Sequence, residues 1–189
     1  MRFALSLSLA VLCLLFASPA FAHILPDETG GLLAGLAHPV FGIDHLLALL
    51  AMGLWSAAMT GRTRLLIIPA VGLLMAASAL AGLAGLALPY METGIALSVL
   101  ILGLMLSFAL QQQVPGLLLI ALFTLFHGNA HGLEAPSGVS LAAYFLGFAL
   151  ASLALVAAGQ WLGRVVLHGP VLRLSGGVVA LAGAWMLLG

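Results

Sequence analysis

The chain has 189 residues, of which 64% are hydrophobic and only 5% are charged, and its formal net charge at pH 7 is zero. A soluble domain of this size needs many more polar and charged residues to cover its surface. The composition therefore excludes that class and indicates a membrane protein with several spanning helices in the lipid bilayer. The few basic residues are scattered along the chain, which argues against nucleic-acid binding.

Residues 1–22 have the pattern of a cleavable signal peptide. Arg2 gives a short positive start, residues 5–16 are apolar, and Ala-Phe-Ala at 20–22 is a small-residue cleavage site. Cleavage would leave His23 as the first mature residue, while an uncleaved first helix stays open as the alternative. The single cysteine, Cys13, lies in this segment, so the mature chain would have no thiolate ligand.

Six apolar segments follow, and about 20 such residues are needed to cross the hydrocarbon core. We expect an all-α transmembrane bundle over residues 23–189, as one domain. The six helices are predicted at 37–59, 65–88, 93–110, 116–133, 139–160 and 170–188. Short connections predict antiparallel neighbours, and the recurring glycines predict close helix contacts.

The basic residues predict the orientation. After Arg2 they all fall on one side of the predicted bundle: Arg62, Arg64, Arg164 and Arg173. The positive-inside rule makes that side cytoplasmic, and export of the signal peptide independently puts the mature N-terminus outside. Trp55 and Trp161 are expected at the inner lipid interface. The acids at the helix ends fall on the outer side, where they would attract cations.

Ionisable residues gather in the first predicted span, which begins His38-Pro39-Val-Phe-Gly42-Ile-Asp44-His45. Such groups are costly in lipid and usually serve an ion path or a binding site. His38 and His45 are seven residues apart, so a continuous helix puts them on one face, about 10 Å apart along its axis. Pro39 and Gly42 permit close helix approach or a local break.

The fourth predicted span ends with a second group, His127-Gly-Asn-Ala-His131-Gly-Leu-Glu134. Its ionisable members follow the spacing i, i+4, i+7 and so form one stripe on a helix. The first and fourth spans run in opposite directions. We therefore expect His45 to lie opposite His127, and His38 to lie nearer Glu134.

Imidazole and carboxylate ligands together suit a divalent transition-metal ion such as nickel, cobalt or zinc. We predict a metal site with these ligands: His38, Asp44, His45, Glu92, His127, His131 and Glu134. Two residues of this set have an alternative interpretation. His38 can cap the helix before Pro39, and Glu92 can be a solvated acid at the end of the third span. A purely structural polar cluster is the alternative for the whole set.

The two motifs, HPVFGIDH and FHGNAHGLE, in a small six-span chain with a signal peptide resemble the HupE/UreJ family of nickel and cobalt permeases. The resemblance extends over nearly the whole chain. It assigns the first family signature to His38, Pro39, Gly42, Asp44 and His45, and the second to His127, Gly128, His131 and Glu134. It implies uptake of a metal ion through the bacterial inner membrane, with Ni²⁺ as the first candidate and Co²⁺ as the second. It also implies an indirect link to hydrogenase or urease maturation.

Further hypotheses concern symmetry and rival functions. Because the first and fourth spans each begin a three-helix half on opposite sides, the halves could form an inverted repeat with the site between them. Assembly of the chain into a homo-oligomer is a further hypothesis.

We expect no enzymatic activity and no prosthetic group. The alternatives are a metal sensor or accessory protein that does not transport, a b-haem electron carrier, and an intramembrane hydrolase, although HGNAH lacks the glutamate of the HExxH pattern.

Overall fold

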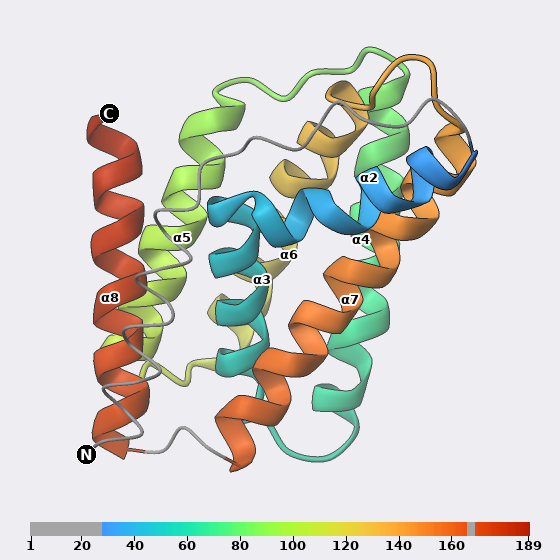
Figure 1. The fold of residues 1–189 in the computed structure, drawn as a ribbon. Helices are drawn as coiled ribbons and strands as arrows, with labels where there is room; N and C mark the ends of the chain where they lie inside the picture. Colours follow the sequence, from blue (N-terminus) through green and yellow to red (C-terminus); the bar gives the residue numbers. More distant parts are fainter. Residues whose placement is uncertain (1–27, 166–168) are drawn as a thin grey trace.

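The computed structural model describes residues 28–165 and 169–189, and within these ranges the chain forms seven α-helices and no β-strand. The helices are α2 (Glu28–Phe41), α3 (Ile43–Ser56), α4 (Gly61–Leu83), α5 (Met91–Ser107), α6 (Gln113–Leu133), α7 (Leu141–Val165) and α8 (Gly169–Leu188) (Figure 1). The all-α prediction is confirmed for these residues. The predicted signal peptide and His23 lie outside them.

The predicted spans are found only in part. Among the described residues, α4, α6, α7 and α8 are long and apolar enough to cross a membrane. Helix α5 has 17 residues, which is short for the hydrocarbon core. The prediction of one continuous helix over 37–59 is wrong, because α2 and α3 meet at an angle of 73°. Counted as one bent span, this pair gives a fifth candidate.

The bend lies at Gly42 and has a local cause. Pro39, in the last turn of α2, has no backbone N–H to donate, and Gly42 takes an extended conformation with φ −72° and ψ 103°. Helix α3 begins at the next residue. In its first turn the Asp44 side chain accepts a 2.7 Å hydrogen bond from the His45 amide. That bond satisfies one of the amides that a helix start leaves free, and the acid suits the positive end of the helix dipole.

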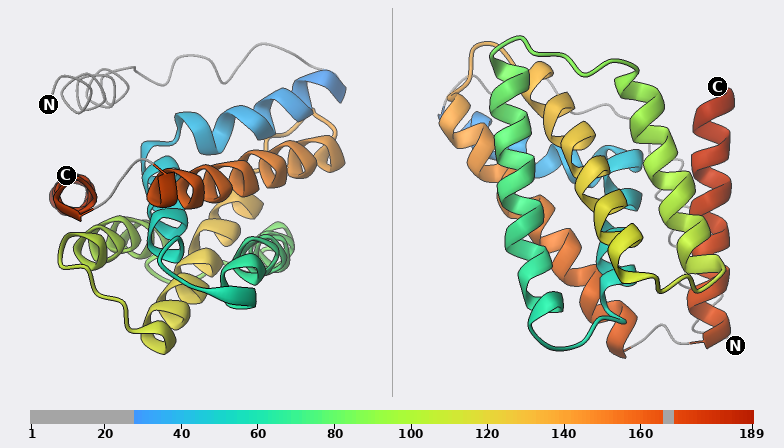
Figure 2. Two further views of the ribbon diagram at one scale, coloured as in Figure 1. Left: turned by 90° about the horizontal axis from the view of Figure 1, so that it is seen from below. Right: turned by 180° about the vertical axis from the view of Figure 1, so that it is seen from behind.

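Helix α3 stands at the centre of the bundle, in contact with α5 and α7 (Figure 1). Helix α2 lies along α7, at a steep angle to α3, and α4 packs on α6 (Figure 2). Helix α8 lies at the edge of the bundle and packs mainly on α5. Helices α2 and α6 therefore both reach the point where α3 begins.

Glycines bring these helix pairs together, as the sequence predicts. Gly53 of α3 faces Gly159 of α7, and a Cβ on either would collide with the backbone of the other helix. Gly82 of α4 and Gly132 of α6 stand in the same relation. Packing between membrane helices is strongest where small residues let the backbones approach. The second of these contacts also fixes the end of α6 that carries the predicted ligands.

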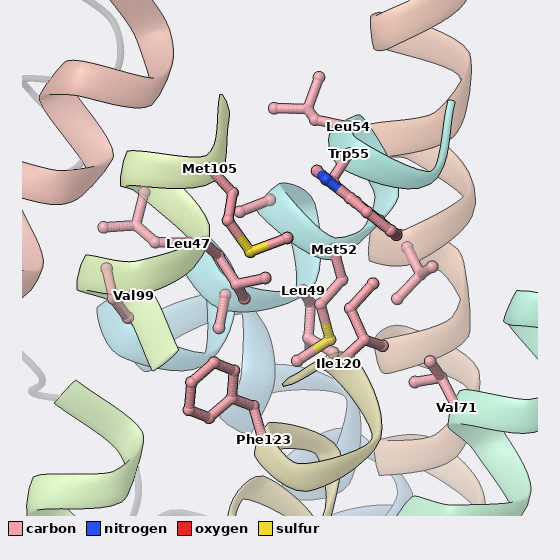
Figure 3. Close-up of a cluster of buried hydrophobic side chains, with 14 of the residues drawn as sticks. Leu47, Leu49, Met52, Leu54, Trp55, Val71, Val99, Met105, Ile120 and Phe123 are labelled. Atoms are coloured by element: carbon pink, nitrogen blue, oxygen red, sulfur yellow. The ribbon is translucent and has the colours of Figure 1, made fainter. Parts of the chain in front are cut away.

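An apolar core occupies the middle of the bundle (Figure 3). Its fully buried side chains include Leu49 and Met52 of α3, which meet Ile120 and Phe123 of α6. Helix α5 adds Val99 and Met105, and α4 adds Val71. This layer lies on the side of the predicted ligands nearer to the arginine-bearing helix ends, because it follows His45 along α3 and precedes His127 along α6.

Trp55 lies in the interior of the bundle and not at the lipid interface. It was expected at the inner lipid interface, but it is fully buried, and its Nε1 donates a 2.7 Å hydrogen bond to the Leu110 carbonyl. Its ring lies where a side chain at position 116 would stand, so Gly116 makes room for it. Trp161 is 56% exposed at the end of α7, which agrees with the expected interfacial position.

Charge is divided between the two ends of the bundle. The arginines lie where α4 begins, α7 ends and α8 begins, at the lower end in Figure 1. Glu92 begins α5 and Glu134 follows α6, both at the upper end. The predicted separation of basic and acidic residues is present. The inverted repeat stays a prediction, since the first predicted span is bent while α6 is a single helix.

The contact between α5 and α8 makes a testable prediction through two adjacent glycines. A Cβ at Gly176 would lie 2.6 Å from the Leu106 Cβ and 2.8 Å from the Gly103 carbonyl oxygen, whereas at Gly177 the nearest atom is 3.7 Å away. We expect Gly176→Ala to lower the free energy of unfolding by about 1–3 kcal/mol, because overpacking strains a tight contact. Thermal unfolding in detergent measures this, with Gly177→Ala as the matched control. Equal melting temperatures for the two variants would contradict the packing described here.

Candidate metal site

The predicted ligands come from three helix ends. His38 lies in the last turn of α2, whereas Asp44 and His45 lie in the first turn of α3. His127 and His131 lie in the last two turns of α6. The bend at Gly42 folds the end of α2 over the start of α3, and α6 runs up to the same point. Three segments thus deliver imidazole rings to one small region.

The histidine rings are in direct contact. The His131 ring centroid lies 4.5 Å from that of His38 and 4.4 Å from that of His45. The His38 and His45 rings are 5.6 Å apart. One ring nitrogen from each of these three residues lies within 4.8 Å of the other two. Two nitrogens that bind one ion at the roughly 2.0–2.1 Å of a zinc site lie at most about 4.2 Å apart, so a small inward shift of the rings lets all three share an ion.

The fourth histidine continues the cluster inward. His127 is fully buried, and its ring centroid lies 4.6 Å from that of His45. It is not one of the three residues whose nitrogens converge within 4.8 Å. The expected pairing of His45 with His127 is present. We call His38, His45 and His131 the outer group. Through His45 this group contacts the deeper His127.

Several ring nitrogens in this cluster have no hydrogen-bond partner. Among the described residues these buried atoms are Nε2 of His45, Nδ1 of His127 and both nitrogens of His131. Burying a polar atom without a partner costs free energy, and most buried polar atoms in proteins are satisfied. A bound metal ion would compensate the free lone pair on each ring, which is one nitrogen of a neutral imidazole, while the other nitrogen of His131 carries its proton.

Two carboxylates contact the cluster. Asp44 Oδ1 lies 2.7 Å from Nδ1 of His45 and also accepts the His45 amide. Glu134 Oε2 lies 3.3 Å from Nε2 of His38, as expected from the antiparallel helices. The Glu134 side chain is 43% exposed, so it stands at the opening of the cluster. Glu92 is exposed in the first turn of α5 and is not among the converging ligand atoms.

Helix α7 supplies a wall that sequence reasoning missed. The Phe148 ring packs on the His131 ring at a centroid distance of 3.7 Å, and the Tyr144 ring lies 6.4 Å from that of His38. Both aromatic residues are buried and stand one turn apart on α7. Their i, i+4 spacing signals a shared face, but it does not reveal which helix that face meets.

Asn129 and Ser98 are further polar residues near the cluster, with different tasks. Asn129 donates to the Leu86 carbonyl at 2.8 Å and accepts from the Leu88 amide at 2.9 Å. It therefore fixes the connection between α4 and α5. Ser98 of α5 contacts His127, with 2.8 Å between its Oγ and Nε2. No motif singles out this serine.

An open cleft of about 380 Å³ lies between the ends of α4 and α6 and the segment 135–141. Gly132 and Leu133 line it, next to His131 and Glu134 in the chain, but none of the cluster histidines does. On the opposite side the apolar layer around Met52 and Phe123 closes the cluster. The histidines thus form a compact, mostly buried group near one end of the bundle.

The comparisons with known proteins bear on the whole chain. A family model described as "HupE / UreJ protein" matches residues 11–186, a range that includes every histidine of the cluster. Protein HupE of Rhizobium leguminosarum bv. viciae is 38% identical over 178 residues, which cover 92% of this chain and 93% of that protein. No solved structure gives a significant match.

The bend itself can be tested at Gly42. A Cβ there would lie 3.1 Å from the His38 carbonyl oxygen, 3.3 Å from Asp44 Oδ1 and 3.4 Å from His45 Nδ1. We expect Gly42→Ala to displace the Asp44–His45 pair and to weaken Co²⁺ binding by about tenfold, the lower end of the range for disturbed ligand supports. Absorption titration of the purified protein with Co²⁺ measures this. Gly177→Ala is the control, and equal affinities for the two variants would show that the bend does not position the rings.

Proposed function

The chain belongs to the HupE / UreJ family. We propose that it is a permease for a divalent transition-metal ion in the bacterial inner membrane, with Ni²⁺ as the first candidate substrate and Co²⁺ as the second. Members of this family are transport or accessory proteins and not enzymes. The described part of the chain contains several helices able to span a membrane. The transported ion is the substrate of such a protein.

Converging imidazole nitrogens are the observation that supports this function most strongly. Three of them lie within 4.8 Å of one another, and four buried ring nitrogens lack a partner. Imidazole suits nickel, copper, iron and zinc, whereas carboxylate, carbonyl and water suit magnesium and calcium. With the carboxylates of Asp44 and Glu134 in contact, the set favours a divalent transition metal.

We propose that the ion arrives at the acidic outer end, where exposed Glu92 and Glu134 attract cations. It exchanges water for the outer group, His38, His45 and His131. From there it reaches His127, which His45 already contacts. Asp44, next to His45, either binds the ion directly or orients the His45 ring. The arginine-bearing end is then cytoplasmic, and the N-terminal end of the mature chain is periplasmic.

A second candidate is an accessory protein that binds the metal without carrying it. The apolar layer between the histidines and the arginine-bearing end favours this candidate, because it closes the path inward. In either case the recipient would be a metalloenzyme under maturation, a hydrogenase or a urease.

Uptake by proteoliposomes tests the proposal. We expect His45→Ala and His131→Ala each to lower radioactive nickel uptake at least about tenfold, because each removes a ligand. Ser175→Ala is the control, since this half-buried serine of α8 donates to the Val171 carbonyl of its own helix, at the edge of the bundle away from the histidines. Unchanged uptake by both histidine variants would refute the site. Metal binding by the wild-type protein without uptake would favour the accessory protein.

Acid should weaken metal binding. Imidazole binds a metal only in its unprotonated form, so protons and the ion compete for the same nitrogens. With several imidazoles in the ligand set, we expect the Ni²⁺ dissociation constant to rise steadily as the pH falls, because each proton taken up removes a ligand nitrogen. Equilibrium binding to the purified protein across a range of pH measures the slope. A dissociation constant that does not change with pH would contradict histidine ligation.

A further inference from the structure

Ser98 is a buried residue of α5 whose hydroxyl touches the deepest histidine of the cluster. Its side chain is fully buried. The Oγ atom lies 2.6 Å from the Ile95 carbonyl oxygen, one helical turn earlier, and 2.8 Å from Nε2 of His127. Both distances are those of good hydrogen bonds. The direction of the two bonds decides which nitrogen of His127 is free.

Counting protons gives that direction. A hydroxyl has one proton to donate, and a carbonyl oxygen can only accept. The Ile95 contact is therefore a hydrogen bond only if Ser98 donates to it. The Ser98 oxygen must then accept from His127, so Nε2 of His127 carries a proton. In a neutral imidazole the other nitrogen, Nδ1, then holds the lone pair.

The remaining surroundings of His127 agree with this assignment. Its Nδ1 is buried and has no hydrogen-bond partner among the described residues. The ring contacts the His45 ring at a centroid distance of 4.6 Å. A lone pair that accepts no hydrogen bond is free to bind a metal ion. A buried N–H at that position would lack an acceptor, which costs free energy.

Asp44 has the same relation to His45 through the opposite nitrogen. Its Oδ1 lies 2.7 Å from Nδ1 of His45, and an ionised carboxylate can only accept, so Nδ1 carries the proton. The free atom of His45 is therefore Nε2, which is buried and unpartnered. A partner on one ring nitrogen commonly fixes the tautomer and leaves the other nitrogen for the metal.

We propose that Ser98 is a positioning residue of the metal path, which holds His127 in the tautomer with a free Nδ1 and so makes that atom the deeper ligand for a divalent ion. This inference rests on the proposed function. Ser98 itself does not touch the ion. Its hydroxyl orients the ring, as Asp44 does for His45, and the two histidines meet the ion through different nitrogens.

Substitution of Ser98 tests the proposal against a closely matched serine. Ser56 is also fully buried, donates to a carbonyl three residues earlier, that of Gly53, and accepts an N–H bond, from Gln160. It lies at the far end of α3. We expect Ser98→Ala to weaken Ni²⁺ binding by about 10- to 100-fold, and Ser56→Ala to leave it unchanged. Equal affinities for these two variants would overturn the proposal.

A spectroscopic readout separates positioning from a general loss of structure. In the metal-free protein labelled with ¹⁵N-histidine, the ring of His127, assigned by its loss in His127→Gln, should show a protonated Nε2 and an unprotonated Nδ1. A protonated Nδ1 in the wild-type protein would overturn the proposal even if Ser98→Ala does not fold. Ser98→Thr keeps the hydroxyl, so we expect it to keep the wild-type tautomer and to restore nickel affinity.

Failure of this inference differs from failure of the proposed function. If the wild-type protein binds nickel and loses it in His127→Gln but not in Ser98→Ala, the function stands and the positioning role falls. If the wild-type protein binds no Ni²⁺ or Co²⁺, the permease proposal falls, and with it the role of Ser98 on a metal path. The ¹⁵N spectrum reports the hydrogen-bond direction in both cases.

Discussion

The break at Gly42 is the constraint on which the cluster depends. On a continuous helix, residues seven apart are separated by about 10 Å along the axis, and two imidazoles at that distance cannot share an ion. The bend of 73° returns the end of α2 over the start of α3, and the His38 and His45 rings come to 5.6 Å. His131 can then contact both. A straight helix would present these residues as two separate sites.

Patterns of spacing predicted the partners in the cluster but not its shape. The i, i+4, i+7 stripe and the opposed helix directions were enough to pair His45 with His127 and Glu134 with His38, and these contacts are present. Pro39 and Gly42 permit either a break or a close helix approach, and both occur in membrane helices. The structure has the break, with α2 packed along α7, and that contact joins parts of the chain about a hundred residues apart.

Single residues without a motif were beyond the reach of the sequence. Ser98, Phe148 and Trp55 each stand in an apolar stretch that looks like ordinary lipid-facing helix. Their roles come from the neighbour across the helix contact: an imidazole nitrogen, an imidazole ring and the Leu110 carbonyl. The glycine pattern, by contrast, was informative, because a missing side chain marks where two backbones approach even when the partner is unknown.

The two carboxylates in contact with the histidines set the electrical balance of a loaded site. Asp44 and Glu134 contribute two negative charges when ionised, while neutral imidazoles contribute none. A doubly charged cation therefore makes the assembly neutral, whereas Na⁺ or K⁺ would leave an excess negative charge. Uncompensated charge is costly within a membrane. Discrimination against monovalent ions would follow from this count alone, before any preference of nitrogen for nickel is considered.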